Sequence, residues 1–277
     1  MNPVTPVELF KATPRNNCKE CGFLTCLAFA TQVIVEKKPI EKCPYIDPDL
    51  RNSLKERIDE QHQVGKYVKK DLYKNTSEFI KEQLEDCDFS SVAEGIGAVF
   101  EEKEGIPLLR FSYMNRNCLL SKEEIFINGK AADNHWDNIL LYNYVHFAGD
   151  APLADEWIPI ENIPGYTPKK SGLEQGCEEK IANHFQGRPA RLQQAASTLG
   201  GKIAADASHA DAAFTIFLLP KIPFYMLFWD EDPEEGFPAR TKVLFDRSVI
   251  NYLDLESLVF LAERFAETMI KVDQEPS

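Results

Sequence analysis

The sequence predicts an α+β fold, in which a small, mainly helical N-terminal module precedes a larger mixed domain with a mostly antiparallel sheet and flanking helices. Near the N-terminus, apolar residues recur at helical spacing. Beyond residue 75, strand-like and helical runs follow one another without strict alternation. Because strict alternation is typical of doubly wound parallel sheets, its absence favours the α+β class.

The length of the chain sets its domain organisation. With 277 residues, of which 44% are hydrophobic, the chain can bury one large core or two ordinary ones. The lysine-rich run Lys66–Lys70 has the character of a link. We therefore expect a module at residues 1–66 and an α+β domain at residues 67–277.

Local signals place the helices of the module. Val7–Lys11 can form a short helical turn, and a longer helix is expected from Cys26 onward. Lys37–Pro39 ends that helix, because proline cannot continue it and lysines complement the C-terminal end of its dipole. Asp47-Pro48 then opens a second helix over Asp49–Gly65, whose leucine and isoleucine residues stand four apart.

The larger domain contains segments of both kinds. Strand-like segments are Gly97–Phe100, Leu108–Tyr113, Glu124–Asn128, Ala212–Leu219, Phe224–Trp229 and Lys242–Phe245. Segments with apolar residues three and four apart are Trp136–Ala148, Leu173–His184, Pro189–Leu199 and Leu253–Ile270. Turn residues separate several of the strand-like segments, which indicates hairpins and therefore antiparallel pairing.

Four cysteines form the most specific motif in the chain. Cys18, Cys21, Cys26 and Cys43 follow the spacing C-x2-C-x4-C-x16-C, and Pro44 comes directly after the last one. Thiolates crowded in this way can surround a compact metal–sulfide cube and neutralise much of the iron charge. We predict that these four cysteines are the ligands of a [4Fe–4S] cluster.

The residues around the cysteines agree with that assignment. Gly22 supplies the backbone freedom that a chain folding tightly around a cube needs. Cys26 is expected at a helix N-terminus, where the dipole favours a thiolate. Pro44 has a fixed φ and no amide hydrogen, so it can set the direction of the fourth ligand and shield it from water.

Zinc and a smaller cluster are the competing interpretations. Structural zinc sites present two short cysteine pairs on separate knuckles, whereas here three ligands bunch together and the fourth stands alone before proline. Plant-type [2Fe–2S] spacing has the two short gaps in the reverse order. The spacing therefore favours [4Fe–4S].

The run Pro14–Ala30, completed by Cys43-Pro44, resembles the [4Fe–4S] module of the corrinoid iron–sulfur protein large subunit and of the B subunit of Rnf-type electron-transport complexes. The resemblance covers roughly the first 60 residues. It implies that the four matching cysteines are cluster ligands and that single electrons pass to a partner, which in the first family is a cobalt corrinoid. Phe23-Leu24 departs from the Glu-Pro or Tyr-Pro often seen in these families, which bears on local packing and not on ligation.

The larger domain resembles a family catalogued as a domain of unknown function in anaerobic bacteria and archaea. Its landmarks are Ala151–Leu153, Glu156–Ile158, Leu199–Gly201, Phe237–Ala239 and Leu244–Asp246. The resemblance spans roughly residues 75–272 and implies no catalytic residue. The D-x-H-x-x-G signature of base-off corrinoid-binding domains is absent from the sequence.

Other polar residues of the larger domain have ordinary structural explanations. The carboxylates between Asp230 and Glu235 can bind a metal or a basic partner, but a solvated loop between strands accounts for them better. His135 and Trp136 could touch a cofactor, but Asp133 is also a good N-cap for the helix that follows, and capping is the interpretation that we favour. Gly200-Gly201 fits a helix-terminating turn.

The remaining titratable side chains carry no site assignment either. His146 and His184 lie in predicted helices, where packed or surface histidines are commoner than ligands. Cys87, Cys118 and Cys177 fit small apolar fillers, because no basic neighbours mark a lowered thiol pKa.

Composition indicates the compartment. No run of about 18 apolar residues occurs, and the N-terminus lacks the basic-then-apolar plan of a signal peptide. Three cysteines remain outside the motif, an odd number that does not fit a disulfide framework. We expect a soluble, cytoplasmic protein without a membrane segment, in a reducing and low-oxygen setting.

Charge is divided unevenly along the chain. Residues 1–74 hold 13 Lys/Arg and 10 Asp/Glu, whereas residues 75–277 hold 18 and 34. A protein with a net charge of −13 is a poor partner for nucleic acid, because phosphate neutralisation supplies most of that affinity. The expected partners are a redox protein or a corrinoid protein, and no pattern sets an oligomeric state.

These features favour a single-cluster electron-transfer or accessory protein over a standalone enzyme. One cluster moves one electron, and no nucleotide, flavin or haem motif is visible. Corrinoid or one-carbon metabolism is the context that the resemblance suggests. The alternatives are an enzyme or maturation factor whose C-terminal domain binds a substrate or metal, and a cluster that acts only as a fold staple.

Overall fold

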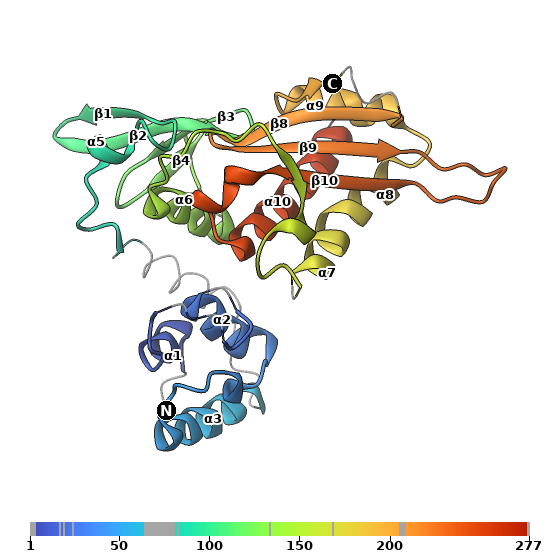
Figure 1. The fold of residues 1–277 in the computed structure, drawn as a ribbon. Coiled ribbons are helices and arrows are strands. Elements are labelled where there is room, and N and C mark those ends of the chain that lie inside the picture. The colour runs from blue at the N-terminus through green and yellow to red at the C-terminus, as the bar shows by residue number, and fades with distance from the viewer. Residues whose placement is uncertain are drawn as a thin grey trace. The chain divides into compact units, whose positions relative to one another are not determined.

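The chain folds into two compact units, shown in a computed structural model (Figure 1). The first comprises Met1–Asp86 with Asp133–His146, and the second comprises Cys87–Ala132 with Phe147–Ser277. The structure describes residues 4–16, 18, 20–23, 25–63, 81, 83–132, 134–167, 169–204 and 209–275. The expected boundary at residues 66 and 67 lies outside the described residues and stays a prediction.

Helices build the cysteine-rich end of the first unit, as expected. They are α1 (Pro6–Lys11), α2 (Cys26–Glu36), the short 3-10 helix η1 (Ile40–Lys42) and α3 (Pro48–Gln63). The Asp47 carboxylate begins α3 by accepting hydrogen bonds from the amides of Asp49 and Leu50, at 3.1 and 3.0 Å. The same unit contains most of α6 (His135–Phe147).

A small hydrophobic core holds these helices together. Leu9 of α1, Phe29 and Val33 of α2, and Leu54 and Ile58 of α3 are all buried in it. The N-terminal segment is tied to α3 by a buried amide pair. Gln61 accepts a hydrogen bond from the Val4 amide at 2.7 Å and donates one to the Val4 carbonyl at 3.3 Å. Burial and hydrogen bonding therefore act together to close the module.

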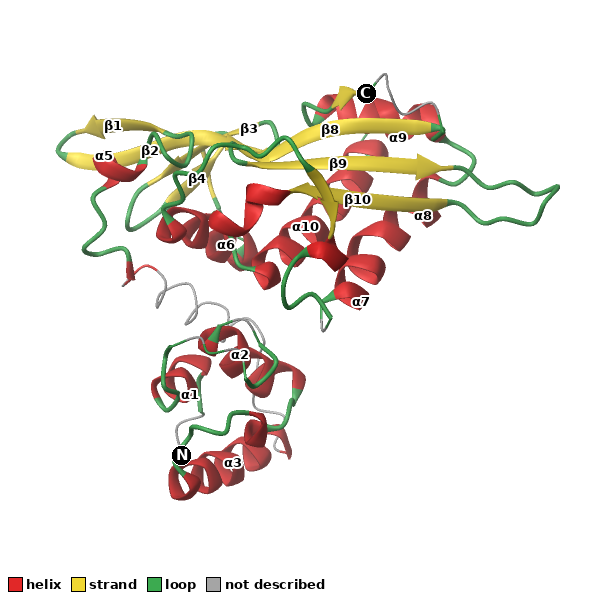
Figure 2. Cartoon of the chain, viewed as in Figure 1, coloured by secondary structure: helices red, strands yellow, loops and turns green. Residues whose placement is uncertain are grey.

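The second unit contains two antiparallel sheets, which confirms the α+β class (Figure 2). The first sheet has the order β1-β2-β3-β4-β5, with strands Val99–Lys103, Ile106–Tyr113, Arg116–Leu120, Ile125–Ile127 and Lys130–Ala131. Its hairpins turn on residue pairs such as Asn128-Gly129, whose φ angles of 50° and 74° suit two-residue turns. The Met114 amide donates to the Leu218 carbonyl at 2.9 Å and joins this sheet to the other.

The second sheet has the order β6-β10-β9-β8-β7. Its strands are β6 (Trp157–Pro159), β7 (Lys202–Ile203), β8 (Ala212–Leu219), β9 (Ile222–Trp229) and β10 (Arg240–Asp246). Alternate side chains of the three long strands are buried, and Phe214, Phe224 and Phe245 among them are at most 1% exposed. These side chains face the helices and form the main core of the unit.

Helices lie on one side of the second sheet (Figure 2). They are α7 (Lys170–Leu173), the π-helical turn η3 (Glu174–Glu178), α8 (Glu179–Phe185), α9 (Pro189–Thr198) and α10 (Leu255–Gln274). The remaining short elements are η2 (Ile160–Asn162), η4 (Arg247–Asn251) and α5 (Phe89–Val92). In the described part of the chain, no helix combines the length and the apolar character that crossing a bilayer requires.

Several sequence expectations are confirmed here. Gly200 has a φ of 82°, and the Gly201 amide donates to the Ala196 carbonyl at 2.8 Å, so the glycine pair does end α9. The carboxylates that follow Trp229 lie in the loop between β9 and β10. Asp133, expected to cap α6, lies outside the described residues. The Asn134 side chain accepts from the amide of Trp136 at 2.9 Å and thus provides a cap.

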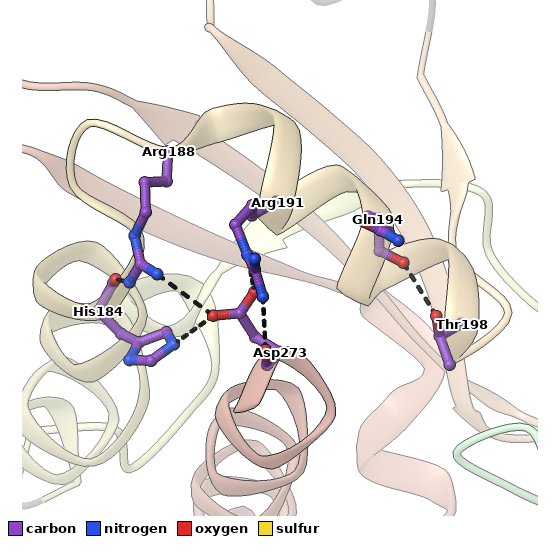
Figure 3. A network of polar contacts seen from close by, with 6 residues as sticks. All are labelled: His184, Arg188, Arg191, Gln194, Thr198 and Asp273. Carbon is purple, nitrogen blue, oxygen red and sulfur yellow. Dashed lines mark hydrogen bonds and ion pairs between the residues drawn. The ribbon is translucent and has the colours of Figure 1, made fainter. Parts of the chain in front are cut away.

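A cluster of charges ties the end of α10 to α8 and α9 (Figure 3). The Asp273 side chain is only 5% exposed. It accepts hydrogen bonds from Arg191 Nε at 2.5 Å and His184 Nε2 at 2.9 Å, and a third from Arg188 at 3.4 Å. His184 is therefore a packed residue within an ion network, as the sequence suggests.

This network predicts a pH-dependent stability. Burial alone would raise the pKa of Asp273, but hydrogen bonds from Arg191 and His184 outweigh it and lower the pKa below that of an ordinary aspartate. The resulting stabilisation is complete above about pH 4, near the pKa of an unfolded aspartate. It is lost as the pH falls through the lower pKa of the folded state.

Replacing Asp273→Asn should lower the free energy of unfolding of the larger unit at neutral pH by about 2 kcal/mol, because charged hydrogen bonds in a buried site are lost. Urea unfolding followed by near-ultraviolet circular dichroism measures the change. The difference in the free energy of unfolding between the variant and the wild type should become smaller below about pH 4. Glu179→Gln removes an exposed carboxylate of α8 and is the control. A gap that stays constant into acid would contradict this role.

Candidate metal centre

The four predicted ligands lie on three backbone segments of the module. Cys18 and Cys21 lie in an irregular loop, Cys26 is the first residue of α2, and Cys43 follows η1. Cys26 and Cys43 are 5% and 3% exposed, and the other two are half-buried. The thiols therefore sit at the edge of the module core, partly shielded from water.

Cys26 stands at a helix N-terminus, as expected. Thr25 is the N-cap, with extended φ and ψ angles of −127° and 153°, and its hydroxyl accepts a hydrogen bond from the Ala28 amide at 3.0 Å. The capped end leaves Cys26 where the partial positive charge of the helix dipole favours a thiolate. Thr25 was not among the predicted residues, although a threonine directly before a helical pattern is a recognised signal for a cap.

The loop between the second and third cysteines turns sharply at Gly22. Its φ is 81°, in the left-handed region where glycine is favoured, and no atom lies within 4 Å of the place a Cβ would take. The chain then buries Phe23, whose ring lies 5.6 Å from that of Phe29 in α2. Phe23, which departs from the related families, thus anchors the loop to the module core.

The return segment is held beside this loop by two contacts. Tyr45 donates from its hydroxyl to Glu20 Oε1 at 2.6 Å, and the Lys42 ammonium lies 5.6 Å from the centre of the Phe23 ring. Cys43 has extended φ and ψ angles of −87° and 111°, as a residue before proline should. Tyr45 and Glu20 could not be paired from the sequence, because they stand 25 residues apart.

Electrostatics show that the sulfur atoms share one region. Burial raises the pKa of the Cys21 thiol, and a hydrogen bond involving Phe23 lowers it. The negative charges of Cys43 and Cys26 raise the pKa further. A hydrogen bond to Glu20 raises the pKa of Tyr45, and the charges of Cys18 and Cys43 add to that effect.

The donor set fits an iron–sulfur cluster in its chemistry. Four thiols from one small region, one of them on a helix N-terminus, match the thiolate ligation that such clusters require. Within the described residues, no three His, Cys, Asp or Glu side chains converge closely enough to hold a single metal ion. The ligand assignment of Cys18, Cys21, Cys26 and Cys43 stays a prediction.

The other cysteines behave as the sequence suggests. Cys118 and Cys177 are fully buried, and burial raises the pKa of Cys177 far above its ordinary value. Burial also raises the pKa of Cys87, which is half-buried. A raised thiol pKa opposes thiolate formation in Cys87 and Cys177. Cys118 is a packing residue by its complete burial.

Two family models match the chain. The model described as "Putative Fe-S cluster" matches residues 14–45, which include all four cysteines. The model described as "Domain of unknown function (DUF3786)" matches residues 88–268. Together they support an iron–sulfur cofactor at the N-terminal end and a separate family for the larger unit. No solved structure matches the chain.

Curated relatives match a short segment only. The corrinoid/iron-sulfur protein large subunit of Moorella thermoacetica is 42% identical over 52 residues, 19% of this chain and 12% of that protein. The acetyl-CoA decarbonylase/synthase complex subunit gamma of Methanocaldococcus jannaschii is 32% identical over 55 residues, 20% and 11% of the two chains. The subunit from Archaeoglobus fulgidus is 32% identical over 65 residues, 21% and 14%. The matched segment is thus a small part of each relative.

Replacing Gly22→Ala should reduce the iron and sulfide that the protein takes up on anaerobic reconstitution, because an alanine at this φ costs roughly 1 kcal/mol in the loop that carries Cys21. Gly236→Ala is the matched control, since Gly236 has a φ of 75° and equally free space but lies in the β9–β10 loop. Iron and sulfide analysis measures the effect. Equal iron contents in the two variants would show that the Gly22 turn does not position the ligands.

Proposed function

The chain belongs to the DUF3786 family, and from that premise, together with its cysteine-rich N-terminal segment, we propose that it is a single-cluster iron–sulfur protein that delivers electrons one at a time to a partner. Cys18, Cys21, Cys26 and Cys43 would hold a [4Fe–4S] cluster. When bound, that cluster supplies a one-electron redox couple. The observation that carries the proposal is the presence of these four cysteines, in the spacing of a cluster motif, within the segment that matches the iron–sulfur family model.

The residues around the thiols suit a redox site. Phe23 and Phe29 cover the region with aromatic side chains, and the lower local polarity strengthens charge interactions there. The Thr25 cap fixes the start of α2 and therefore the position of Cys26. The module also has a hydrophobic core of its own, which favours a role beyond that of a fold staple.

The surface of the module suits an acidic partner. Lys37 and Lys38 line a cavity of about 170 Å³ where α2 ends, together with Lys55 and His62 of α3. Within the described part of the chain, Lys37 and Lys38 form no ion pair, whereas Lys55 pairs with Glu41. Two unpaired ammonium groups beside an apolar wall can receive a carboxylate of a docking protein.

The names of the relatives support a choice of electron acceptor for this chain. They are a corrinoid/iron–sulfur protein and subunits of acetyl-CoA decarbonylase/synthase complexes. We extend that context to this chain as redox support of corrinoid or one-carbon metabolism, with a corrinoid protein or another redox protein as the electron acceptor. In this proposal the module spans residues 1–66, the domain spans residues 67–277, and the protein works in the cytoplasm.

Anaerobic reconstitution tests the cluster. We expect the wild type to bind iron and sulfide in equal amounts, about four of each per chain, and to be reduced reversibly by one electron. Cys43→Ser should lose most of the cluster or change its electron paramagnetic resonance signal, because a thiolate ligand is removed. Cys87→Ser, outside the motif, is the control. Zinc without iron would contradict the assignment of an iron–sulfur cluster. A cluster that cannot be reduced and reoxidised would contradict the electron-transfer role.

A second measurement tests the acceptor. The reduced protein is mixed with a Co(II) corrinoid protein, and the visible spectrum is followed for formation of Co(I). Charge reversal of Lys37 and Lys38 to Glu should slow the transfer at low ionic strength, since steering by complementary charges is a rate effect. Lys103→Glu in β1 is the matched surface control. If no corrinoid protein gives a spectral change, a corrinoid protein is excluded as the electron acceptor, and the cluster assignment is unaffected.

A further inference from the structure

One face of the second sheet carries none of the described helices of the second unit. This open face is formed by the odd-numbered residues of β8 from Ala213 to Phe217, those of β9 from Pro223 to Trp229, and the even-numbered residues of β10 from Arg240 to Leu244. They alternate with the side chains packed under the helices. Helices α7–α10 all lie on the opposite side (Figure 2).

The open face is apolar and aromatic. Tyr225, Leu227 and Trp229 form a small cluster with Ala213 and Leu244, separate from the main core, and Ala204 and Ala210, which lie between β7 and β8, pack against it. Ala213 and Leu227 are only 5% and 8% exposed, whereas Tyr225 and Trp229 are half-buried. Trp157 of β6 extends this surface, since its ring centre lies 5.4 Å from that of Tyr225. Phe217 is 43% exposed at the other end. The half-buried aromatic side chains are the part of this surface that a partner can reach.

The charge of the open face is opposite in sign to the net charge of the larger domain. None of the residues that form the open face is acidic, although residues 75–277 hold 34 Asp/Glu against 18 Lys/Arg. Arg240 lies 4.2 Å from the Trp229 ring centre, and Lys202 of β7 stands beside Thr215 in the register. Within the described residues, neither cation forms an ion pair. The open face therefore favours a partner with carboxylates around an apolar side chain.

The loop between β9 and β10 has that chemistry. It carries Glu234 and Glu235, which form no ion pair in the described part of the chain, and Phe237, which is 61% exposed. The Asp232 carboxylate accepts from the amides of Glu234 and Glu235 at 3.0 and 3.1 Å. Asp232 and Phe237 also pair through their backbones at 2.9 and 3.0 Å. These bonds preorganise the loop, which reduces the entropy lost on binding.

The loop does not cover the open face of its own chain. It continues the β9–β10 hairpin and projects beyond the strands (Figure 1). Its first residues are held from the side, because Gln186 donates to Glu231 at 2.5 Å and the Gly187 amide donates to Asp230 at 2.7 Å. The loop and the half-buried aromatic residues Tyr225 and Trp229 of the open face therefore both remain accessible on one unit.

We propose that the open face is a dimer interface, occupied by the 230–239 loop of a second copy of this chain. Phe237 of each copy packs on Tyr225 and Trp229 of the other, and the Glu234 and Glu235 carboxylates face Arg240 and Lys202. Each copy contributes the same loop and the same open face, so a twofold axis relates the two copies and both loops are bound in a closed dimer. A second copy is favoured over other acidic partners because this chain itself supplies the matching loop.

Sedimentation velocity of the full chain tests the interface. The wild type should sediment as a dimer at low ionic strength and dissociate as salt is raised, because the outer ion pairs are screened. Phe237→Ser should weaken dimerisation at least tenfold, roughly the loss of one buried aromatic anchor. Ile250→Ser, which removes an apolar side chain that is 45% exposed in η4, is the matched control. A monomeric wild type, or a dimer unaffected by Phe237→Ser, would overturn the proposal.

A charge swap distinguishes this interface from any other. Arg240→Glu and the double variant Glu234→Lys with Glu235→Lys should each be monomeric, because like charges then meet in both halves of the dimer. Mixing the two variants should restore a dimer, since each loop now meets a face of opposite charge. Thermal unfolding of each variant verifies its fold. Failure of the mixture to associate, with both variants folded, contradicts the proposed pairing.

Discussion

Burial in one small hydrophobic core is the constraint that shapes the cysteine-rich end of this protein. Helices α1, α2 and α3 each contribute buried side chains to that core, Cys43 belongs to it, and Cys21 packs against it. The same burial raises the pKa of the Cys21 thiol. The left-handed turn at Gly22 and the Tyr45–Glu20 contact set the path of the loop and of the return segment beside the core.

The larger unit obeys a different constraint, the need to bury one face of a twisted antiparallel sheet. Its helices do this on one side only, and the end of α10 is clamped by the charges around Asp273. The opposite face retains an aromatic surface that no helix covers. A module that matches an iron–sulfur family model and a surface with the chemistry of an interface thus belong to one chain, an arrangement that suits a protein working with partners.

Sequence patterns predicted the long elements and two of the short ones, α1 and β4, and missed other short strands. β8 was expected at its observed bounds, because eight residues of apolar and β-branched character indicate a strand without help from neighbours. The strands β3, β5, β6 and β7 were missed, since they are short and owe their conformation to pairing with adjacent strands. β1 begins two residues later than expected and includes charged Glu101, which pairs with Arg110 across the hairpin.

By itself, the sequence determined the α+β class, the candidate ligand set, the glycine turn within it and the acidic loop between two strands, because these features depend on spacing, periodicity and residue type along the chain. Only the tertiary structure decided that Tyr45 meets Glu20, that Asp273 joins His184 and Arg191, and that one sheet face stays open. Those outcomes depend on which distant segments come together, and close approach in space is set by packing of the whole core rather than by any local pattern.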